Sequence, residues 1–141
     1  MRLSTKSRYG TRMLIDIAQN AHNGPVSVAE IGSRTGISEK YMEKLIRRLK
    51  RAGLVTSKRG PKGGHLLAKP AEDISVGDIV RALEDCVVLK GCALGRDTCD
   101  TCTRLVSCPT KTIWEQASDA MFKTLDSYTL QSLIGQAQQY V

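Results

Sequence analysis

Residues 27–55 read SVAEIGSRTGISEKYMEKLIRRLKRAGLV, and their pattern is the clearest indication of the fold in the chain. Ser27, with Glu30 three residues later, forms a capping box, which predicts a short helix up to about residue 35. Gly36 then breaks the helix, and Ser38 can cap a second one. Two helices joined by a tight turn at this spacing are typical of a helix-turn-helix, in which the second helix offers its first residues to the major groove of DNA.

The second helix has one apolar face and one strongly basic face. Its apolar residues recur at helical spacing: Met42, Leu45, Ile46 and Leu49. Its basic residues lie on or beside the same helix: Lys40, Lys44, Arg47, Arg48, Lys50 and Arg51. Glu39 and Glu43 are its only acids. A solvated basic surface would explain such a run, but the segment that follows favours DNA binding.

A glycine-rich hairpin follows this helix. Residues 54–58 and 65–68 are predicted strands, and they enclose the basic loop RGPKGG at residues 59–64. A helix-turn-helix followed by such a hairpin is a winged helix, and we expect Arg59 to enter the minor groove. DNA contacts are predicted from the start of the helix and from the loop, at Ser38, Lys40, Tyr41, Glu43, Lys44, Arg47, Arg59, Gly60, Pro61, Lys62 and Gly63.

Further helices are predicted on both sides of this unit. An amphipathic helix is expected at residues 5–21, and Ser75 with Asp78 marks the start of another that runs to residue 85. Pro109 begins a longer helix that continues to Leu125, and residues 129–134 form a last short one. The apolar stripe of the longer helix suggests packing against a second copy, with packing inside one chain as the alternative.

The predicted fold is mainly α with a small β-hairpin wing. A winged helix-turn-helix DNA-binding domain takes residues 1–70, and residues 71–141 form a region with a cysteine loop and a long C-terminal dimerisation helix. The first part has 15 Lys and Arg against 4 acids, net +11, and the second has 6 against 10, net −4. This asymmetry favours a polyanion-binding module coupled to a part that does not touch the polyanion, although an unevenly charged soluble surface would also show it.

All five cysteines lie within residues 86–108, CVVLKGCALGRDTCDTCTRLVSC. The sequence has no run of about 18 apolar residues and no signal-peptide start, so we expect a cytoplasmic protein with no membrane partner. A reducing cytosol disfavours disulfides, so the cluster indicates a metal site or a redox sensor. An enzyme has no support beyond these thiols, because His22 and His65 lie in the basic half and no phosphate-binding motif is present.

Several stretches carry a resemblance to a known family. They are MRLSTKSRYG, ISEKYMEKLIRRLKRAGLV, SKRGPKGGHLLA, ISVGDIVRALED and the cysteine loop before Trp114. In these the chain resembles the winged-helix regulators of the IscR and NsrR type, which belong to the Rrf-two family of bacterial transcription factors. The resemblance implies a homodimer that binds double-stranded DNA at near-palindromic operators. It also implies an iron-sulfur cluster in many members, whereas others act through thiols or a protein partner.

The resemblance assigns the two outer cysteines. The family pattern has three cysteines, with five residues between successive ones. Counting inward from Gly77 and from Trp114 places the first and the last of these at Cys92 and Cys108. Between them this chain is four residues longer than the pattern.

The resemblance also bears on the recognition helix. A Glu at the position of Glu43 tunes the choice of operator in the IscR type.

The middle of the loop departs from the family. Cys99 and Cys102 stand where the pattern has one cysteine, and the two familiar positions of a fourth ligand are occupied by Lys111 and Arg8. An ammonium group has no lone pair for a metal. The hypothesis is that four thiolates hold one [2Fe-2S] or [4Fe-4S] cluster: Cys92, Cys99, Cys102 and Cys108. Cys86 is expected to be a small buried hydrophobe.

The predicted function is that of a bacterial transcription regulator whose operator binding depends on this iron-sulfur cluster. The signal would be cluster supply, oxygen, nitric oxide or redox state. Alternatives are a zinc-containing regulator, in which four thiolates hold a structural ion and which we favour less, and a metal-free thiol switch at Cys99 and Cys102. A further alternative is control by a regulatory protein partner.

Overall fold

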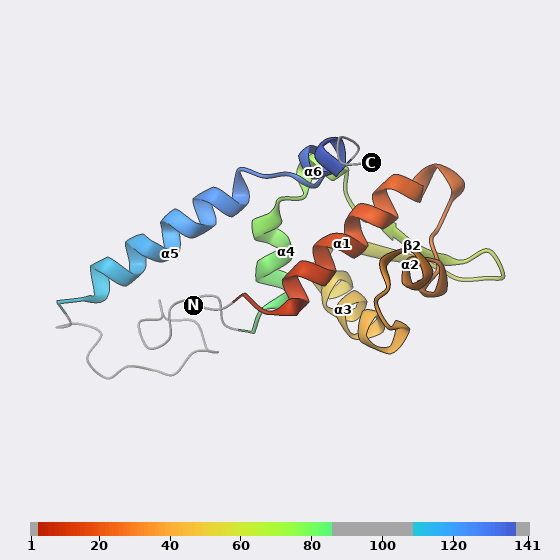
Figure 1. Ribbon diagram of the computed structural model, residues 1–141, viewed down its shortest axis with the longest axis horizontal. Coiled ribbons are helices and arrows are strands. Elements are labelled where there is room, and N and C mark those ends of the chain that lie inside the picture. The colour runs from red at the N-terminus through yellow and green to blue at the C-terminus, as the bar shows by residue number, and fades with distance from the viewer. Residues whose placement is uncertain (1–2, 86–108, 138–141) are drawn as a thin grey trace.

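The computed structural model describes residues 3–85 and 109–137 (Figure 1). In chain order the elements are α1 (Thr5–Asn20), a 3₁₀ turn η1 (Ala21–Asn23), α2 (Val28–Thr35), α3 (Glu39–Arg51), β1 (Val55–Lys58), β2 (Gly64–Leu67), a second 3₁₀ turn η2 (Ala71–Asp73), α4 (Val76–Leu83), α5 (Lys111–Asp126) and α6 (Leu130–Ala137). Figure 1 shows α1 to α4 grouped together, with the hairpin projecting from this group on the right and α5 extending away from it on the left. The predicted helices are all present, with ends that differ by a few residues.

Local signals account for the helix-turn-helix. The capping box is present: Ser27 Oγ accepts the Glu30 N–H over 3.2 Å, and the Glu30 carboxylate accepts the Ser27 N–H over 2.8 Å. Helix α2 ends at Gly36, whose φ of +70° is left-handed and suits glycine. The start and the end that the sequence predicts for this helix are therefore confirmed.

Ser38 behaves differently from its prediction. It occupies the N-cap position of α3 in an extended conformation, but its hydroxyl makes no capping hydrogen bond. Its carbonyl oxygen instead accepts the N–H groups of Tyr41 and Met42, over 3.1 and 3.0 Å. The first turn of α3 is closed by backbone bonds, so the Ser38 hydroxyl stays on the exposed surface where this helix begins.

The wing is an antiparallel pair in which Val55 faces Leu67 and Lys58 faces Gly64. Its base is tied to the segment before α2, because Val26 and His65 exchange two backbone hydrogen bonds of 3.0 and 2.8 Å. The hairpin is therefore anchored to the helix-turn-helix and not only joined to it through α3. The winged-helix arrangement predicted from the sequence is confirmed.

Helix α4 begins as predicted. Ser75 Oγ accepts the Asp78 N–H over 3.0 Å, and the Asp78 carboxylate accepts the Ser75 N–H over 3.1 Å. The helix ends at Leu83, two residues before the predicted end, because Glu84 turns to an extended conformation. None of the described helices is long and apolar enough to cross a membrane.

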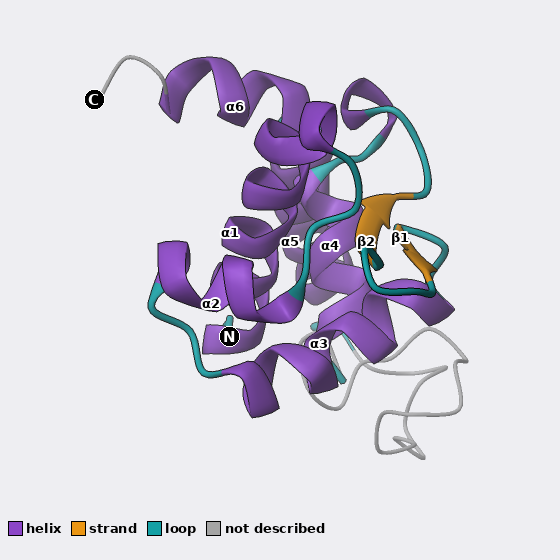
Figure 2. Cartoon of the chain, turned by 90° about the vertical axis from the view of Figure 1, so that its right-hand side faces the viewer, coloured by secondary structure: helices purple, strands orange, loops and turns teal. Residues whose placement is uncertain are grey.

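One hydrophobic core holds these elements together. It contains the buried faces of α1, α2 and α3 together with Ile74, Ile79, Leu83 and Leu130. Figure 2 shows α2 and α3 on one side of α1 and α6 on the other, in agreement with the contacts that α1 makes with all three. Elements that follow residue 70 thus complete the core of the winged helix, and the division into two domains at that residue stays a prediction.

Candidate nucleic-acid interface

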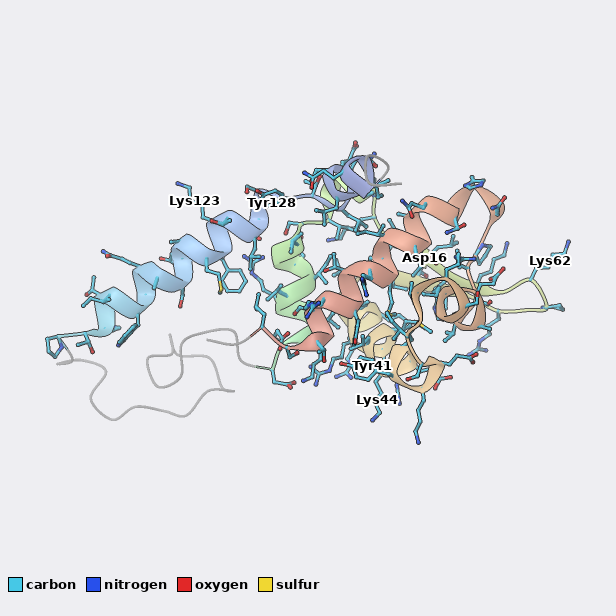
Figure 3. The ribbon with its side chains drawn as sticks, in the orientation of Figure 1. Asp16, Tyr41, Lys44, Lys62, Lys123 and Tyr128 are labelled. Carbon is cyan, nitrogen blue, oxygen red and sulfur yellow. The ribbon has the colours of Figure 1, made fainter. Side chains whose placement is uncertain are left out.

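Helix α3 has one buried apolar face and one exposed polar face. Its buried residues are the four apolar ones predicted from the sequence: Met42, Leu45, Ile46 and Leu49. On the opposite face Lys40, Glu43, Lys44 and Arg47 are exposed, as is Ser38 at the start of the helix. In Figure 3 the Lys44 side chain projects from α3 away from the body of the molecule. The predicted contact residues of this helix therefore share one accessible surface.

The exposed cations predicted to contact DNA, on α3 and on the wing, have no ion-pair partner within the described residues. There, the cations that do pair with a carboxylate are Lys6, Arg34, Arg48, Arg81 and Lys111. Lys40, Lys44 and Arg47 are absent from that set, and so are Arg59 and Lys62 of the wing. None of these cations is held in an ion pair with a described carboxylate, so their positive charge remains available to the phosphates of a nucleic acid.

Tyr41 is the half-buried member of the predicted set. Its ring packs edge to face on Tyr9 of α1, with centroids 5.9 Å apart and planes at 87°. Its hydroxyl lies 3.5 Å from Thr5 Oγ1 at the start of α1. The contact fixes the first turn of α3 against α1 and leaves the phenol oxygen at the edge of the exposed surface. Thr5 and Tyr9 are neighbours of this surface that the sequence patterns did not indicate.

The wing loop presents its side chains to solvent. Arg59, Gly60, Pro61 and Lys62 are all exposed, and Figure 3 shows Lys62 at the tip of the hairpin. Gly60 has a φ of +120°, and its carbonyl oxygen accepts the Gly63 N–H over 2.9 Å. A Cβ atom on Gly63 would collide with the Lys58 carbonyl oxygen. The turn therefore requires glycine at position 63, and this keeps the loop narrow enough to approach a phosphate chain.

An ion pair fixes α2 against α1. Arg34 donates from Nε and from one terminal nitrogen to the two carboxylate oxygens of Asp16, both over 2.8 Å. Asp16 is buried, and its side-chain hydrogen bond raises the pKa of Arg34, so the guanidinium keeps its positive charge. This bidentate contact holds the first helix of the helix-turn-helix in place and thereby the angle at which α3 is presented.

His65 lies at the base of the wing and not on the contact surface. Burial lowers its pKa, and the positive charge of Lys50 lowers it further, so the imidazole is neutral at pH 7. Its Nδ1 lies 3.0 Å from Ser57 Oγ in the facing strand. His65 therefore supports the hairpin, in agreement with its omission from the predicted ligands and contacts.

Arg48 belongs to the basic run of α3 but points elsewhere. Its guanidinium donates to the Leu83 carbonyl oxygen over 2.7 Å and to Asp85 over 2.6 Å. Asp85 also accepts a hydrogen bond from Lys6 over 2.6 Å. No sequence pattern indicates this cluster, because its members are far apart along the chain. Arg48 is thus a residue that joins α3 to the end of α4.

The predicted metal ligands, Cys92, Cys99, Cys102 and Cys108, lie outside the described residues. Within residues 3–85 and 109–137, no group of three or more His, Cys, Asp and Glu side chains comes together that could hold a metal ion. Lys111 forms an ion pair with Glu115 over 3.6 Å, as an ammonium group would. The four predicted ligands would together offer four thiolates, a donor set that suits iron-sulfur clusters.

Comparisons with known proteins agree with this geometry. The sequence matches the family described as "Rrf2: Iron-dependent Transcriptional regulator" over residues 3–136. It is 49% identical to Protein rrf2 of Nitratidesulfovibrio vulgaris, over 97% of this chain and 89% of that protein. Both the matched family and this relative extend across the whole winged helix and the C-terminal helices.

Two solved structures have the same fold. The first is T. potens IscR, 38% identical, with a TM-score of 0.75 over 99% of this chain and 90% of that one. The second is CymR (YrzC), the global cysteine regulator of B. subtilis, 34% identical, with a TM-score of 0.73 over 96% of this chain and 97% of that one. The family resemblance seen in the sequence is thereby confirmed. The chain belongs to the Rrf2 family of transcriptional regulators, and it is a regulator and not an enzyme.

Proposed function

We propose that this regulator binds operator DNA through α3 and the wing. The observation that carries the proposal is the set of exposed cations without ion-pair partners in the described chain: Lys40, Lys44, Arg47, Arg59 and Lys62. The first turn of α3 adds the Ser38 hydroxyl and the positive end of the helix dipole, both of which suit a phosphate. Glu43 stands among the cations, where a carboxylate accepts a hydrogen bond from cytosine.

The regulator acts as a homodimer in this proposal. All of α5 is described, and Ser118 is its only buried residue, whereas Ile113 is 58% exposed and Trp114 41% exposed. A second copy would cover these apolar side chains. Two-fold symmetry then places two α3 helices in successive major grooves, about 34–36 Å apart, which corresponds to a near-palindromic operator. Analytical ultracentrifugation tests this: a monomer at micromolar concentration contradicts the dimer.

Operator binding is controlled, we infer, by an iron-sulfur cluster that Cys92, Cys99, Cys102 and Cys108 would hold. Support comes from the donor chemistry of four thiolates and from the family, which is described as iron-dependent. Oxygen, nitric oxide or iron shortage can alter such a cluster or remove it. The protein's own part is to present four thiolates between α4 and α5 and to pass their state to α3.

Anaerobic purification tests the cluster directly. We expect a coloured protein with stoichiometric iron and acid-labile sulfide. Cys92→Ala should lose both, whereas the matched control Cys86→Ala should keep them. Cys99→Ala and Cys102→Ala show whether both middle cysteines are needed. A colourless protein with stoichiometric zinc contradicts the cluster and leaves a constitutive DNA-binding protein.

A metal-free thiol switch is the second candidate. It is favoured by the similarity to CymR, the global cysteine regulator of B. subtilis, over 96% of this chain. In that case Cys99 and Cys102 form a reversible disulfide on oxidation, and neither iron nor zinc copurifies. Mass spectrometry of the oxidised protein after alkylation distinguishes the two. A regulatory partner, the third candidate, would copurify in stoichiometric amount.

Sequence recognition is tested at two positions. Lys40→Ala should weaken binding to operator and to random DNA alike, because a lysine on a phosphate carries no sequence information. Arg59→Ala should weaken operator binding and also reduce the ratio of operator to random affinity, because a minor-groove arginine senses groove width. If both variants bind both DNAs like the wild type, the interface is elsewhere.

A further inference from the structure

Three helices meet at the two residues that precede position 86. Glu84 Oε1 accepts hydrogen bonds from the Ser4 N–H and hydroxyl, over 3.1 and 2.8 Å, and from the Ser7 hydroxyl. Burial raises the pKa of Glu84, but the bonds from Ser7 and Ser4 outweigh it and the net shift is downward. Asp85 accepts from Lys6 over 2.6 Å. The start of α1 is thus attached to the residues immediately after α4.

Arg48 attaches α3 to the same place. Its two terminal nitrogens reach different acceptors, the Leu83 carbonyl oxygen at the end of α4 and the carboxylate of Asp85. The first contact satisfies an unpaired carbonyl at the helix C-terminus, and the positive charge suits that end of the helix dipole. In the described residues Arg48 is the only cation of α3 that has a carboxylate partner. Helix α3 therefore has one charged link to the chain that leads into residues 86–108.

Helix α4 is also attached to α5. Arg81 donates to both carboxylate oxygens of Asp126, over 2.8 and 2.6 Å, and its guanidinium lies 4.3 Å from the ring centroid of Phe122. Ser75 Oγ donates to Asp126 as well, over 3.2 Å. A Cβ atom on Gly77 would overlap the Asp126 carboxylate, so the two helices approach at a glycine. Helix α4 therefore contacts both the C-terminal end of α5 and the C-terminal end of α3.

We propose that the Arg48–Asp85 ion pair passes the state of residues 86–108 to α3, with Arg48 and Asp85 as positioning residues and neither as a DNA contact nor a metal ligand. The inference rests on the proposed function, because it needs a loop with two states. A change in what residues 86–108 hold would move their first anchored neighbour, Asp85. Because Asp85 holds Arg48, the displacement reaches the last turn of α3 and changes how its basic face is presented.

The geometry suits a reversible link better than a rigid brace. The two side chains are 34% and 65% exposed, and exposed ion pairs contribute little to stability. Beside them is a surface hollow of about 410 Å³, lined in part by Arg51, Ala82 and Glu84, which gives the pair space to rearrange. A contact of this kind can be biased by a bound group, because a ligand shifts an equilibrium only by its differential affinity for the two states.

The test compares operator affinity in the two states of the loop. Fluorescence anisotropy of a labelled operator gives Kd for the cluster-bound and the cluster-free homodimer, and the ratio of the two is the coupling. For coupled sites this ratio is typically about 5- to 150-fold. We expect Asp85→Ala to reduce it at least about threefold. Iron and sulfide content, and the melting temperature of the cluster-free protein, should stay near the wild-type values.

Two further variants exclude a merely structural role. Arg48→Met should reduce the ratio as Asp85→Ala does, and the double variant should lose no more than either single one, because both remove the same link. Arg34→Met breaks an ion pair that does not touch α4. It should lower the melting temperature and the operator affinity of both states alike, and leave the ratio unchanged.

The outcomes separate this inference from the proposed function. If the wild-type ratio is above one and Asp85→Ala leaves it unchanged, the inference is overturned and the proposed function is not. Losses that add up in the double variant overturn it too, because the residues then act independently. A wild-type protein without a cluster, or with a ratio of one, contradicts the proposed function, and the inference is then overturned with it.

Discussion

Lys44 allows the DNA interface to be tested by salt. Its side chain projects from the middle of the exposed face of α3, and it forms no ion pair within the described residues. We predict that Lys44→Ala lowers operator affinity and also weakens the dependence of that affinity on salt. The second effect is the more diagnostic, because it counts the phosphate contacts that are lost.

The magnitude follows from the charges on the surface. Each phosphate contact on B-DNA contributes about 0.9 to the slope of log K against log salt concentration. A homodimer loses two contacts in the variant, so the slope should fall by about 1.8. Between 50 and 200 mM salt the wild type should then lose about 12-fold more affinity than Lys44→Ala does. The five cations of each protomer set an upper limit of about 9 for the wild-type slope.

Fluorescence anisotropy at four or five salt concentrations measures these slopes. Lys123→Ala is the matched control, because this lysine is exposed on α5, far from the wing in Figure 3, and should leave the slope unchanged. A wild-type slope in Lys44→Ala, or an equal reduction of the slope in Lys123→Ala, would contradict a phosphate contact at Lys44. In either case the phosphates would lie against another surface.

Two predictions concern the fold that supports this surface. Gly10→Ala and Gly135→Ala each gain up to about 1 kcal/mol in helix propensity. A Cβ atom on Gly10 would collide with the buried Leu83 side chain, whereas one on Gly135 would have nothing within 4 Å. Urea unfolding should therefore separate the two variants by about 1–3 kcal/mol, and equal stabilisation would contradict this close packing. The hydrogen bond from Arg81 lowers the pKa of Asp126 below 3.8, so the unfolded chain binds the proton more readily and the stabilisation, present above about pH 4, is lost as the pH falls through the folded pKa. The difference in unfolding free energy between wild type and Asp126→Asn should accordingly shrink between pH 5 and pH 3, and a constant difference would rule out this ion pair as the cause.

The sequence predicts the winged helix well because its signals are local. The capping boxes at Ser27 and Ser75 each involve residues three positions apart, and Gly36 takes the left-handed conformation that ends α2. Such patterns need no tertiary information. Ser38 shows the limit: its position was predictable, but whether the hydroxyl or the backbone closes the first turn depends on the neighbouring chain.

The charged links of the site were not predictable. Arg48 has the same place in the basic pattern as Lys44 and Arg47, and only the packing of α4 on α3 turns it inward to Asp85, 37 residues away. A charge pattern shows which residues lie on one face of a helix, but it does not show which of them forms an ion pair with a residue distant in the sequence. The cysteine ligands lie outside the described residues, so their assignment still depends on the sequence and on the family.

The two attachments of α4 have a consequence for how such proteins diversify. Residues 86–108 join Asp85, held by Arg48 and Lys6, to a helix held by Arg81, and none of these contacts involves the segment itself. Lengthening a loop of this size by four residues costs only about 0.2 kcal/mol in closure entropy. Selection can therefore change the chemistry of the segment, including its number of thiols, while α3 and the wing remain intact. The spare cysteine of this chain is the kind of variation that such an architecture tolerates.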